Sequence, residues 1–356
     1  MRAAQYLRYM VEAGASDLHI KVGLPPVLRV DGVLRHTPYE PLTAADSEQI
    51  AAELLPESKL IEFRETNEAD IGYTLEGVGR FRVNVFRQKG EVGVAIRRVR
   101  SDIPNFDELK LPPAVGALAA ESRGLVLITG PAGTGKTTTI ASMIGWINEH
   151  RRLHIVTMED PIEVVHDDVN SIVDQREIGY DTASYMIGMR YVVRQDPDVI
   201  FIGEIRDRET VEAAIQAAET GHLVISTLHT LDATETVNRI IDLFPPEMQR
   251  QVRVSLAASL KGIMSQRLVP RADGKGRVPA VEVLINTGRV AERIIKPEET
   301  ASIPDVMGEG EFYGMQTFDQ ALVKLVRDGL VTVDDAMEAS TNPHDFHLAL
   351  KEAQLA

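Results

Sequence analysis

A glycine-rich stretch has the composition and spacing of a phosphate-binding loop. It reads GPAGTGKT from Gly130 to Thr137, after the apolar run GLVLIT and before a helix-forming run. That setting is the one the G-x-x-x-x-G-K-[ST] pattern requires, and it makes a chance glycine-rich turn the weaker reading. Backbone N–H groups of such a loop turn inward toward anionic oxygens, and the helix N-terminus adds a positive field. The predicted nucleotide-binding residues are Gly130, Pro131, Ala132, Gly133, Thr134, Gly135, Lys136, Thr137 and Thr138.

Two side chains of this loop have specific chemistry. The Lys136 ammonium would reach the β- and γ-phosphates, and the Thr137 hydroxyl would bind Mg²⁺. The expected cofactors are therefore ATP and Mg²⁺.

Acidic residues follow two further apolar runs. Glu204 comes directly after DVIFIG, and Glu159, Asp160 and Glu163 follow HIVTM. Ligands of an open parallel sheet sit at the carboxyl ends of its strands, so these acids are expected near the phosphate loop. A single loop acid is most often only solvated, but Glu204 ends a strand that should be wholly buried. Gly203 stands where many phosphate-loop enzymes have a magnesium-binding Asp, which calls for a more specific comparison.

Two histidines bracket another apolar run, TGHLVISTLHT. Seven extended residues would place His222 and His229 roughly 23 Å apart. Their odd spacing also puts them on opposite faces of a straight strand, which excludes a shared metal. We expect His229 at the same sheet edge as the phosphate loop and Glu204, where it can meet the γ-phosphate. His222 would begin the strand at the far edge, where it is structural or faces a neighbouring subunit.

The composition bounds what else the chain can be. Its 356 residues suit two domains. With 38 basic and 53 acidic residues, the formal charge of −15 argues against broad nucleic-acid binding. The absence of cysteine excludes disulfides, thiolate zinc sites and cysteine nucleophiles. No run approaches the roughly 18–20 apolar residues of a membrane span, so we predict a cytoplasmic protein. Peripheral membrane attachment is compatible with this.

The elements that position these residues fall into two regions. Residues 1–100 predict a small α+β domain, with hairpin turns at Asp31-Gly32 and Lys89-Gly90 and a helix begun by a Thr43/Asp46 capping box. Residues 101–113 contain three prolines and predict a linker. From residue 114, continuous apolar strands alternate with helices, which indicates a parallel sheet covered on both faces. A helical tail is expected from about 289 to 356.

Four sequence boxes together resemble the type IV pilus twitching-motility ATPases, the PilT family of the secretion ATPase superfamily. They are GPAGTGKTTT, TMEDPIE, DPDVIFIGEIRD with Gly in place of the usual Asp, and AAETGHLVISTLHT followed by RIIDLFP. The N-terminal GASDLHIKVGLPPVLRVDG and GRFRVNVFRQ are also similar to the family. The likeness runs from about residue 12 to 270 and resumes at GMQTFDQAL.

The resemblance implies a homohexameric ring of subunits with a PAS-like N-terminal domain and a RecA-like ATPase domain. It further implies an inner-membrane platform protein as partner, pilin as an indirect partner, and a location at the inner face of the cytoplasmic membrane. The motor would hydrolyse ATP to drive pilus retraction.

Residue roles also follow from the resemblance. Glu204 would be the catalytic carboxylate and a metal neighbour beside Thr137, and Glu163 is a second acid candidate. His229 would sense the γ-phosphate, and His222 lies in the same box, as Glu159 and Asp160 lie in the acidic box. Arg82 and Arg97 match the arginine positions of the N-terminal domain and would reach a nucleotide held partly by a neighbouring subunit. Further candidates are Arg190 and Arg194.

One departure leaves the direction of pilus movement open. A retraction-associated signature close to AIRNLIRE appears here only as RVAERIIKPEE, residues 289–299. An accessory retraction ATPase is therefore a close alternative. An extension or secretion ATPase is less favoured, because those generally carry a longer N-terminal region and a four-cysteine insert. A nucleotide-gated ring with little turnover is a third reading, against which Lys136, Thr137 and Glu204 argue.

Overall fold

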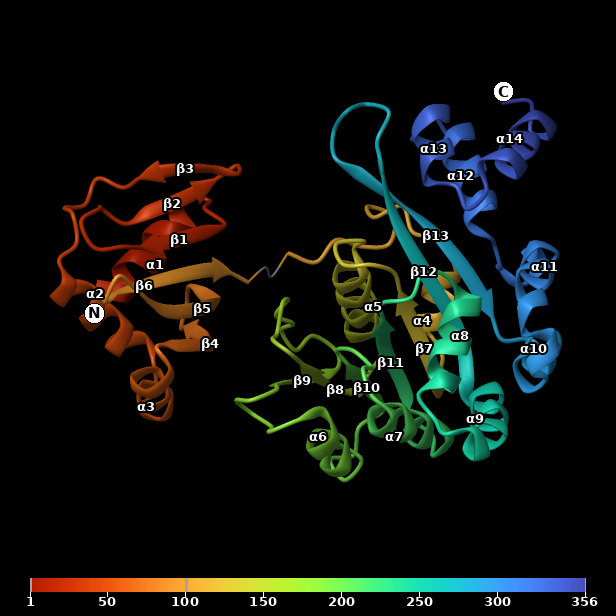
Figure 1. Ribbon diagram of the computed structural model, residues 1–356, viewed down its shortest axis with the longest axis horizontal. Helices are drawn as coiled ribbons and strands as arrows, with labels where there is room; N and C mark the ends of the chain where they lie inside the picture. The colour runs from red at the N-terminus through yellow and green to blue at the C-terminus, as the bar shows by residue number, and fades with distance from the viewer. Residues whose placement is uncertain (1, 100–101, 356) are drawn as a thin grey trace. The chain divides into compact units, whose positions relative to one another are not determined.

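The computed structural model describes residues 2–99 and 102–355, which divide into two compact units (Figure 1). The first unit takes the chain as far as residue 102 together with 161–165, and the second takes 103–160 and 166 onward. Within the described residues, no helix is both long and apolar enough to cross a membrane.

The first unit is a six-stranded antiparallel sheet with three helices. Its strand order is β3-β2-β1-β6-β5-β4. Both predicted hairpin turns are present, because Asp31, Gly32, Lys89 and Gly90 all have the positive φ that tight two-residue turns need. The predicted capping box at Thr43 begins α2. The elements are α1 (Arg2–Glu12), β1 (Asp17–Ile20), β2 (Val27–Val30), β3 (Val33–His36), α2 (Ala44–Leu54), α3 (Glu57–Thr66), β4 (Glu68–Leu75), β5 (Gly79–Gln88) and β6 (Glu91–Arg98).

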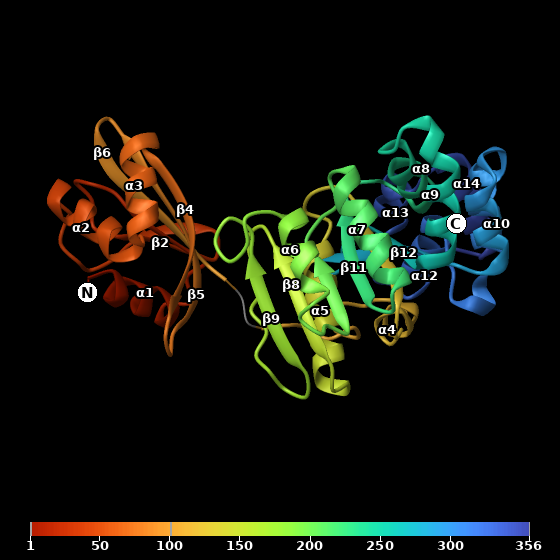
Figure 2. The same ribbon diagram turned by 90° about the horizontal axis from the view of Figure 1, so that it is seen from below.

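The second unit is built on a seven-stranded sheet of order β13-β12-β7-β11-β10-β8-β9, parallel except for β13 (Figure 2). The mixed α/β class with a parallel-rich sheet is therefore confirmed. Its elements are α4 (Ala114–Ala119), β7 (Gly124–Thr129), α5 (Lys136–His150), β8 (His154–Glu159), β9 (Ile172–Glu177), α6 (Tyr185–Val192), β10 (Val199–Ile202), α7 (Arg208–Glu219), β11 (Leu223–Leu228), α8 (Ala233–Asp242), α9 (Pro246–Ser259), β12 (Leu260–Pro270), β13 (Arg277–Ile285), α10 (Gly288–Ile295), η1 (Pro297–Ser302), α11 (Ile303–Gly308), η2 (Glu311–Tyr313), α12 (Phe318–Arg327), α13 (Val333–Ala339) and α14 (Pro343–Glu352).

Helices cover both faces of this sheet, as the continuous apolar strands predict. Along β7, Val126 and Ile128 join the core under α4 and α5. Leu125 and Leu127 point the other way, into the core shared with α7 to α11. All six residues of β7 and of β11 are buried, which explains why these strands show no polar alternation.

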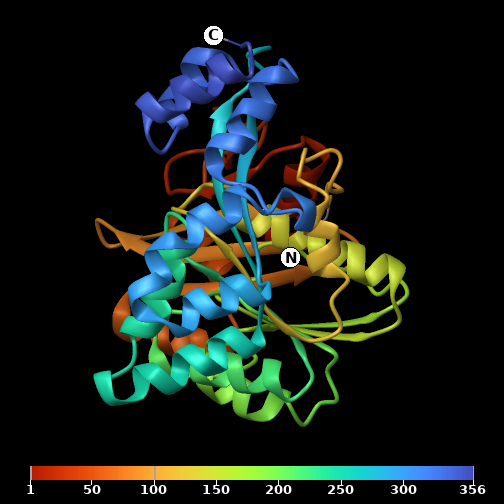
Figure 3. The same ribbon diagram turned by 90° about the vertical axis from the view of Figure 1, so that its right-hand side faces the viewer.

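The C-terminal helices α12–α14 form a separate small core on the β12–β13 hairpin (Figure 3). Arg267 of β12 anchors them. Its guanidinium carbon lies 3.8 Å from the ring centre of Phe318, and Nη1 donates a 2.8 Å hydrogen bond to the Ala339 carbonyl. A cation over an aromatic ring adds electrostatic attraction to apolar packing.

The segment predicted as a linker differs from that expectation over most of its length. Arg100 and Ser101 lie outside the described residues, but from Ile103 the chain groups with the second unit. The Ser142 hydroxyl of α5 donates a 2.7 Å bond to the Pro104 carbonyl, and Leu111 is buried. Apolar side chains of this segment pack into the core beneath α4 and α5. The prolines of the segment predict a linker but do not predict this packing.

Candidate active site

The phosphate loop joins β7 to α5 and depends on its glycines. Gly130, Gly133 and Gly135 have φ values of +141°, +79° and +92°, which side-chain-bearing residues rarely adopt. A Cβ on Gly130 would lie 2.6 Å from the Gln266 carbonyl oxygen of β12, so this glycine is required by space as well. The loop is thereby held against β12, and its residues Ala132 and Gly133, which unlike Pro131 carry backbone N–H groups, are exposed as an anion nest needs.

Lys136 and its two neighbours begin α5 at this loop. The Lys136 side chain is buried, and Nζ donates bonds of 2.6 Å and 2.9 Å to the carbonyls of Gly130 and Pro131. Its ammonium therefore lies over the loop. Thr137 and Thr138 are exposed in the first helical turn, where backbone N–H groups have no partner within the helix.

The strand order brings Glu204 and His229 together beside this loop. Strand β11 lies between β7 and β10, and all three are parallel. The C-terminal ends of these three strands therefore lie side by side at one end of the sheet, which is the edge where the phosphate loop begins. His229 follows β11, Glu204 follows β10, and the imidazole Nε2 lies 3.4 Å from the Glu204 Oε2. Both predicted residues are at the predicted edge.

The other oxygen of Glu204 pairs with Arg206, which the sequence analysis did not single out. The Glu204 side chain is only 14% exposed, whereas that of Arg206 is 69% exposed. Hydrogen bonding to Glu204 is the largest cause that raises the pKa of Arg206, so the guanidinium stays charged. Arg206 stands within the sequence GEIRD, two residues after Glu204, and this short spacing is the sequence feature that could have predicted their ion pair.

Gly203 has a steric reason to lack a side chain. A Cβ there would lie 2.7 Å from the Tyr185 hydroxyl of α6 and 3.2 Å from the Met158 carbonyl. A side chain at this position would require the Tyr185 hydroxyl to move and would sit tightly against the Met158 carbonyl, whereas the next residue, Glu204, places a carboxylate at this edge. Burial is the largest cause that raises the pKa of Tyr185, followed by the charges of Asp160 and Glu204. Tyr185 therefore remains a hydroxyl donor beside these acids.

Glu159 and Asp160 differ although they are adjacent. Glu159 ends β8 with 8% exposure, and its Oε1 accepts 2.6 Å and 3.1 Å bonds from Thr157 Oγ1 and Gln175 Nε2. Asp160 is exposed beyond the strand end. Glu159 is thus fixed in place, whereas Asp160 is accessible to a ligand at this edge.

The third acid of that box, Glu163, groups with the first unit. Its Oε1 lies 4.0 Å from Nη1 of Arg82. Arg82 on β5 is directly opposite Arg97 on β6, so the two predicted arginines are neighbours on one sheet face. Like charges in that position repel each other. Asp17 of β1, opposite Arg97, relieves this by accepting a 2.8 Å bond from the Arg97 Nε.

Asp17 was not found from the sequence. Burial raises the pKa of Asp17, but hydrogen bonds from Ser16 and Arg97 and nearby positive charge outweigh it, and the net shift is downward. The carboxylate therefore stays charged and orients Arg97. The pairing of Arg82 with Arg97 places two arginines on one face of the sheet, where their positive charge suits an anionic ligand.

The remaining predicted residues are not brought to the phosphate loop within the chain. His222 precedes β11 at the opposite edge of the sheet, where Nδ1 lies 2.9 Å from the Ala217 carbonyl at the end of α7. Arg190 of α6 and Arg194 just after it are exposed. Roles for these three in nucleotide binding stay predictions.

A buried histidine near Glu159 gives a pH-dependent stability. The His166 backbone N–H donates a 2.8 Å bond to Gln175, the residue that also holds Glu159. Burial lowers the pKa of His166 from 6.5 to about 4, and Nδ1 has no hydrogen-bond partner among the described residues. The folded protein therefore prefers neutral imidazole, and stability present above pH 6.5 is lost as the pH falls toward 4.

We expect His166→Leu to remove this part of the acid destabilisation, on the order of 3 kcal/mol between pH 6.5 and 4. Urea unfolding of wild type and variant at pH 7, 6 and 5 measures it. His347→Leu, which changes an exposed histidine of α14, is the matched control and should keep the wild-type slope. An unchanged slope for His166→Leu would contradict the prediction.

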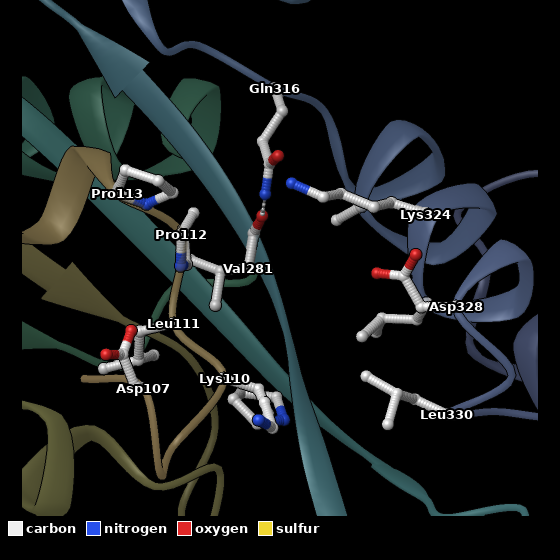
Figure 4. A pocket seen from close by; sticks show the side chains of 13 residues that line it. Asp107, Lys110, Leu111, Pro112, Pro113, Val281, Gln316, Lys324, Asp328 and Leu330 are labelled. Atoms are coloured by element: carbon white, nitrogen blue, oxygen red, sulfur yellow. Dashed lines mark hydrogen bonds between the residues drawn. The ribbon is translucent and has the colours of Figure 1, made fainter. Parts of the chain in front are cut away.

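A cavity of about 330 Å³ lies elsewhere in the second unit, between residues 107–113, β13 and α12 (Figure 4). Lys110 and Lys324 line it together with Asp107 and Asp328. None of the predicted site residues does. The candidate active site is therefore the open sheet edge at the phosphate loop, not this cavity.

Comparisons with known proteins show the family of this chain. Residues 3–340 match the family described as Type II/IV secretion system protein. The chain is 41% identical over 99% of its length to the type IV pilus ATPase PilU of Pseudomonas aeruginosa, covering 92% of that protein. It is 39% identical over 97% of its length to that organism's PilT, named a type IV pilus retractation ATPase, covering all of it. A crystal structure of the pilus retraction motor PilT with bound ADP superposes with a TM-score of 0.87, at 45% identity, over 96% of this chain and 98% of that one.

Proposed function

The chain belongs to the type II/IV secretion system protein family, and we propose that it is a hexameric ATPase motor that shortens type IV pili. It is an ATPase whose near relatives are named for pili. The observation that carries the proposal is the meeting of Glu204 and His229, 3.4 Å apart, just beyond the ends of β10 and β11. Strand β11 is the neighbour of the phosphate-loop strand β7, and β10 is the next strand along.

The phosphate loop would bind the nucleotide through its backbone N–H groups and Lys136. Thr137 and Glu204 would hold Mg²⁺, since a hydroxyl and a carboxylate are the hard oxygen ligands that this ion prefers. An Mg²⁺ ion held there would supply positive charge to the phosphate oxygens. Glu204 then accepts a hydrogen bond from the attacking water and orients it toward the γ-phosphate.

His229 is proposed to report the state of the γ-phosphate. Its imidazole is 55% exposed at the strand end and lies within reach of Glu204. A hydrogen bond from His229 Nε2 to a γ-phosphate oxygen would compete with its contact to Glu204. Loss of the γ-phosphate would return His229 to Glu204, so hydrolysis changes the contacts at the end of β11.

Arg82 and Arg97 are proposed to act on the nucleotide of a neighbouring subunit in a ring of six. Two arginines at opposed positions of β5 and β6 supply positive charge that suits the phosphoryl oxygens in the transition state, and such arginines are often supplied in trans. Light scattering of the purified protein with ATP tests the ring. A mass that corresponds only to monomer would overturn both the hexamer and this role.

The direction of movement rests on the relatives' names and needs its own experiment. The altered signature, Arg289–Glu299, forms α10 and the start of η1, with Pro297 just beyond the helix end. This departure favours a second candidate function, an accessory retraction ATPase that supports another motor. Its partner would be an inner-membrane platform protein, with pilin moved indirectly, at the cytoplasmic face of the membrane.

A deletion strain separates these functions. For a retraction motor, we expect cells that keep surface pili but no longer twitch, measured by electron microscopy and by motility on agar. Loss of surface pili would instead indicate assembly. For an accessory ATPase, retraction would persist at reduced force or speed, and expression of this chain alone in a strain without other retraction ATPases would not restore it.

A further inference from the structure

A buried polar network links the phosphate-loop strand to the helix that follows His229. The Thr129 hydroxyl, at the last residue of β7, donates a 3.0 Å bond to Ser265 on β12. Ser265 is directly opposite Glu282 on β13, so their side chains share one face of the sheet, and hydrogen bonding from Ser265 is among the causes that lower the pKa of Glu282. The Glu282 Oε1 accepts a 2.8 Å bond from the backbone N–H of Ala233, the first residue of α8. All four residues are less than a tenth exposed.

The loop that carries His229 is itself fastened to α8. The Thr230 hydroxyl lies 2.6 Å from the hydroxyl of Thr236, and both residues are buried. The Thr236 hydroxyl also bonds the Asp232 carbonyl at 2.7 Å. His229 is followed by Thr230, and only Leu231 separates Thr230 from Asp232, the N-cap residue of α8. A displacement of the α8 N-terminus is therefore expected to shift the position of His229.

We propose that Glu282 is a positioning residue that ties the start of α8, and with it the His229 loop, to the end of the phosphate-loop strand. A buried N–H left without an acceptor is costly, and the Glu282 carboxylate is the acceptor of the buried Ala233 N–H. This inference rests on the proposed nucleotide role of His229.

The charges around Glu282 indicate that its role depends on the length of its side chain rather than on its net charge. Burial, as the largest cause, raises the pKa of Glu282 to about 7. Asp232 raises it further, whereas the Ala233 and Ser265 bonds and Arg267 lower it. Arg267 also faces Asp319 and Asp232. A neutral side chain of the same length should therefore serve as well as the carboxylate.

Two conservative substitutions test this. Glu282→Gln keeps the length and an acceptor oxygen, and we expect ATP turnover within about twofold of wild type. Glu282→Asp keeps the charge but is one methylene shorter, so its carboxylate cannot reach the Ala233 N–H. We expect kcat to fall about tenfold with the Kd for ATP nearly unchanged. The opposite order, with Gln impaired and Asp active, would overturn the proposal.

A double-mutant cycle with His229→Ala separates positioning from general loss of structure. If Glu282 acts through the His229 loop, Glu282→Asp should lower kcat about tenfold in the wild-type background and by less than about twofold when His229 is already Ala. Equal losses in both backgrounds would contradict the proposal, as would a His229→Ala variant with wild-type turnover. Melting temperatures confirm that every variant is folded. Absence of turnover in the wild type itself would reject the ATPase function instead, which keeps the two failures distinct.

Discussion

Replacing Glu204 with Gln is expected to lower the rate of ATP hydrolysis by about 10³-fold while leaving ATP binding almost intact. Glu204 lies two residues beyond the end of the buried strand β10, and its two oxygens face Arg206 and His229. Gln keeps the size of the side chain, so the neighbouring elements keep their places. It cannot take a proton, and it orients a water molecule more weakly than a carboxylate does.

The measurement pairs steady-state phosphate release with equilibrium binding of a fluorescent ATP analogue. Glu212→Gln is the matched control, since it makes the same change of charge on an exposed part of α7. We expect it to match wild type in both assays. Turnover retained in Glu204→Gln would contradict the catalytic assignment. A loss of binding as large as the loss of turnover would instead place Glu204 mainly in metal and nucleotide binding.

This edge of the sheet could be predicted because its strands are local and continuous in the sequence. Each of β7, β10 and β11 is a short, predominantly apolar segment that is wholly buried, and the residues just after each strand stand at the same end of a parallel sheet. The meeting of His229 with Glu204 follows from that rule alone. Even the pairing of Arg82 with Arg97 is implied by the Lys89-Gly90 turn, because counting back equal steps from it brings these two residues opposite.

The contacts that sequence reasoning missed join segments far apart in the chain. Thr129 and Ser265 are separated by 136 positions, and nothing in either local pattern reveals that β12 lies beside β7. Strand β9 also escaped notice, because as an edge strand it is polar and half exposed. Glu163 shows the same limit. Its place after β8 predicted the phosphate edge, yet it groups with the first unit beside Arg82.

Lys136→Ala is expected to weaken binding of ATP and to lower turnover together, the latter by about 10² to 10³-fold. The Lys136 Nζ lies over the loop, where it bonds the carbonyls of Gly130 and Pro131. Its removal takes away the positive charge nearest to the phosphates as well as two bonds that brace the loop. Because the charge acts on bound ATP and on the transition state alike, both measurements should change.

The two variants should differ in nucleotide occupancy. Glu204→Gln should bind ATP but hydrolyse it very slowly, whereas Lys136→Ala should bind little nucleotide at the same ATP concentration. Lys275→Ala, in the exposed turn between β12 and β13, removes the same charge without touching the loop and should bind and turn over ATP as wild type does. If Lys136→Ala bound ATP with wild-type affinity, the loop at residues 130–137 would not be the nucleotide site. If it bound weakly yet turned over normally at saturating ATP, Lys136 would serve binding alone, and stabilisation of the transition state would have to come from other cations.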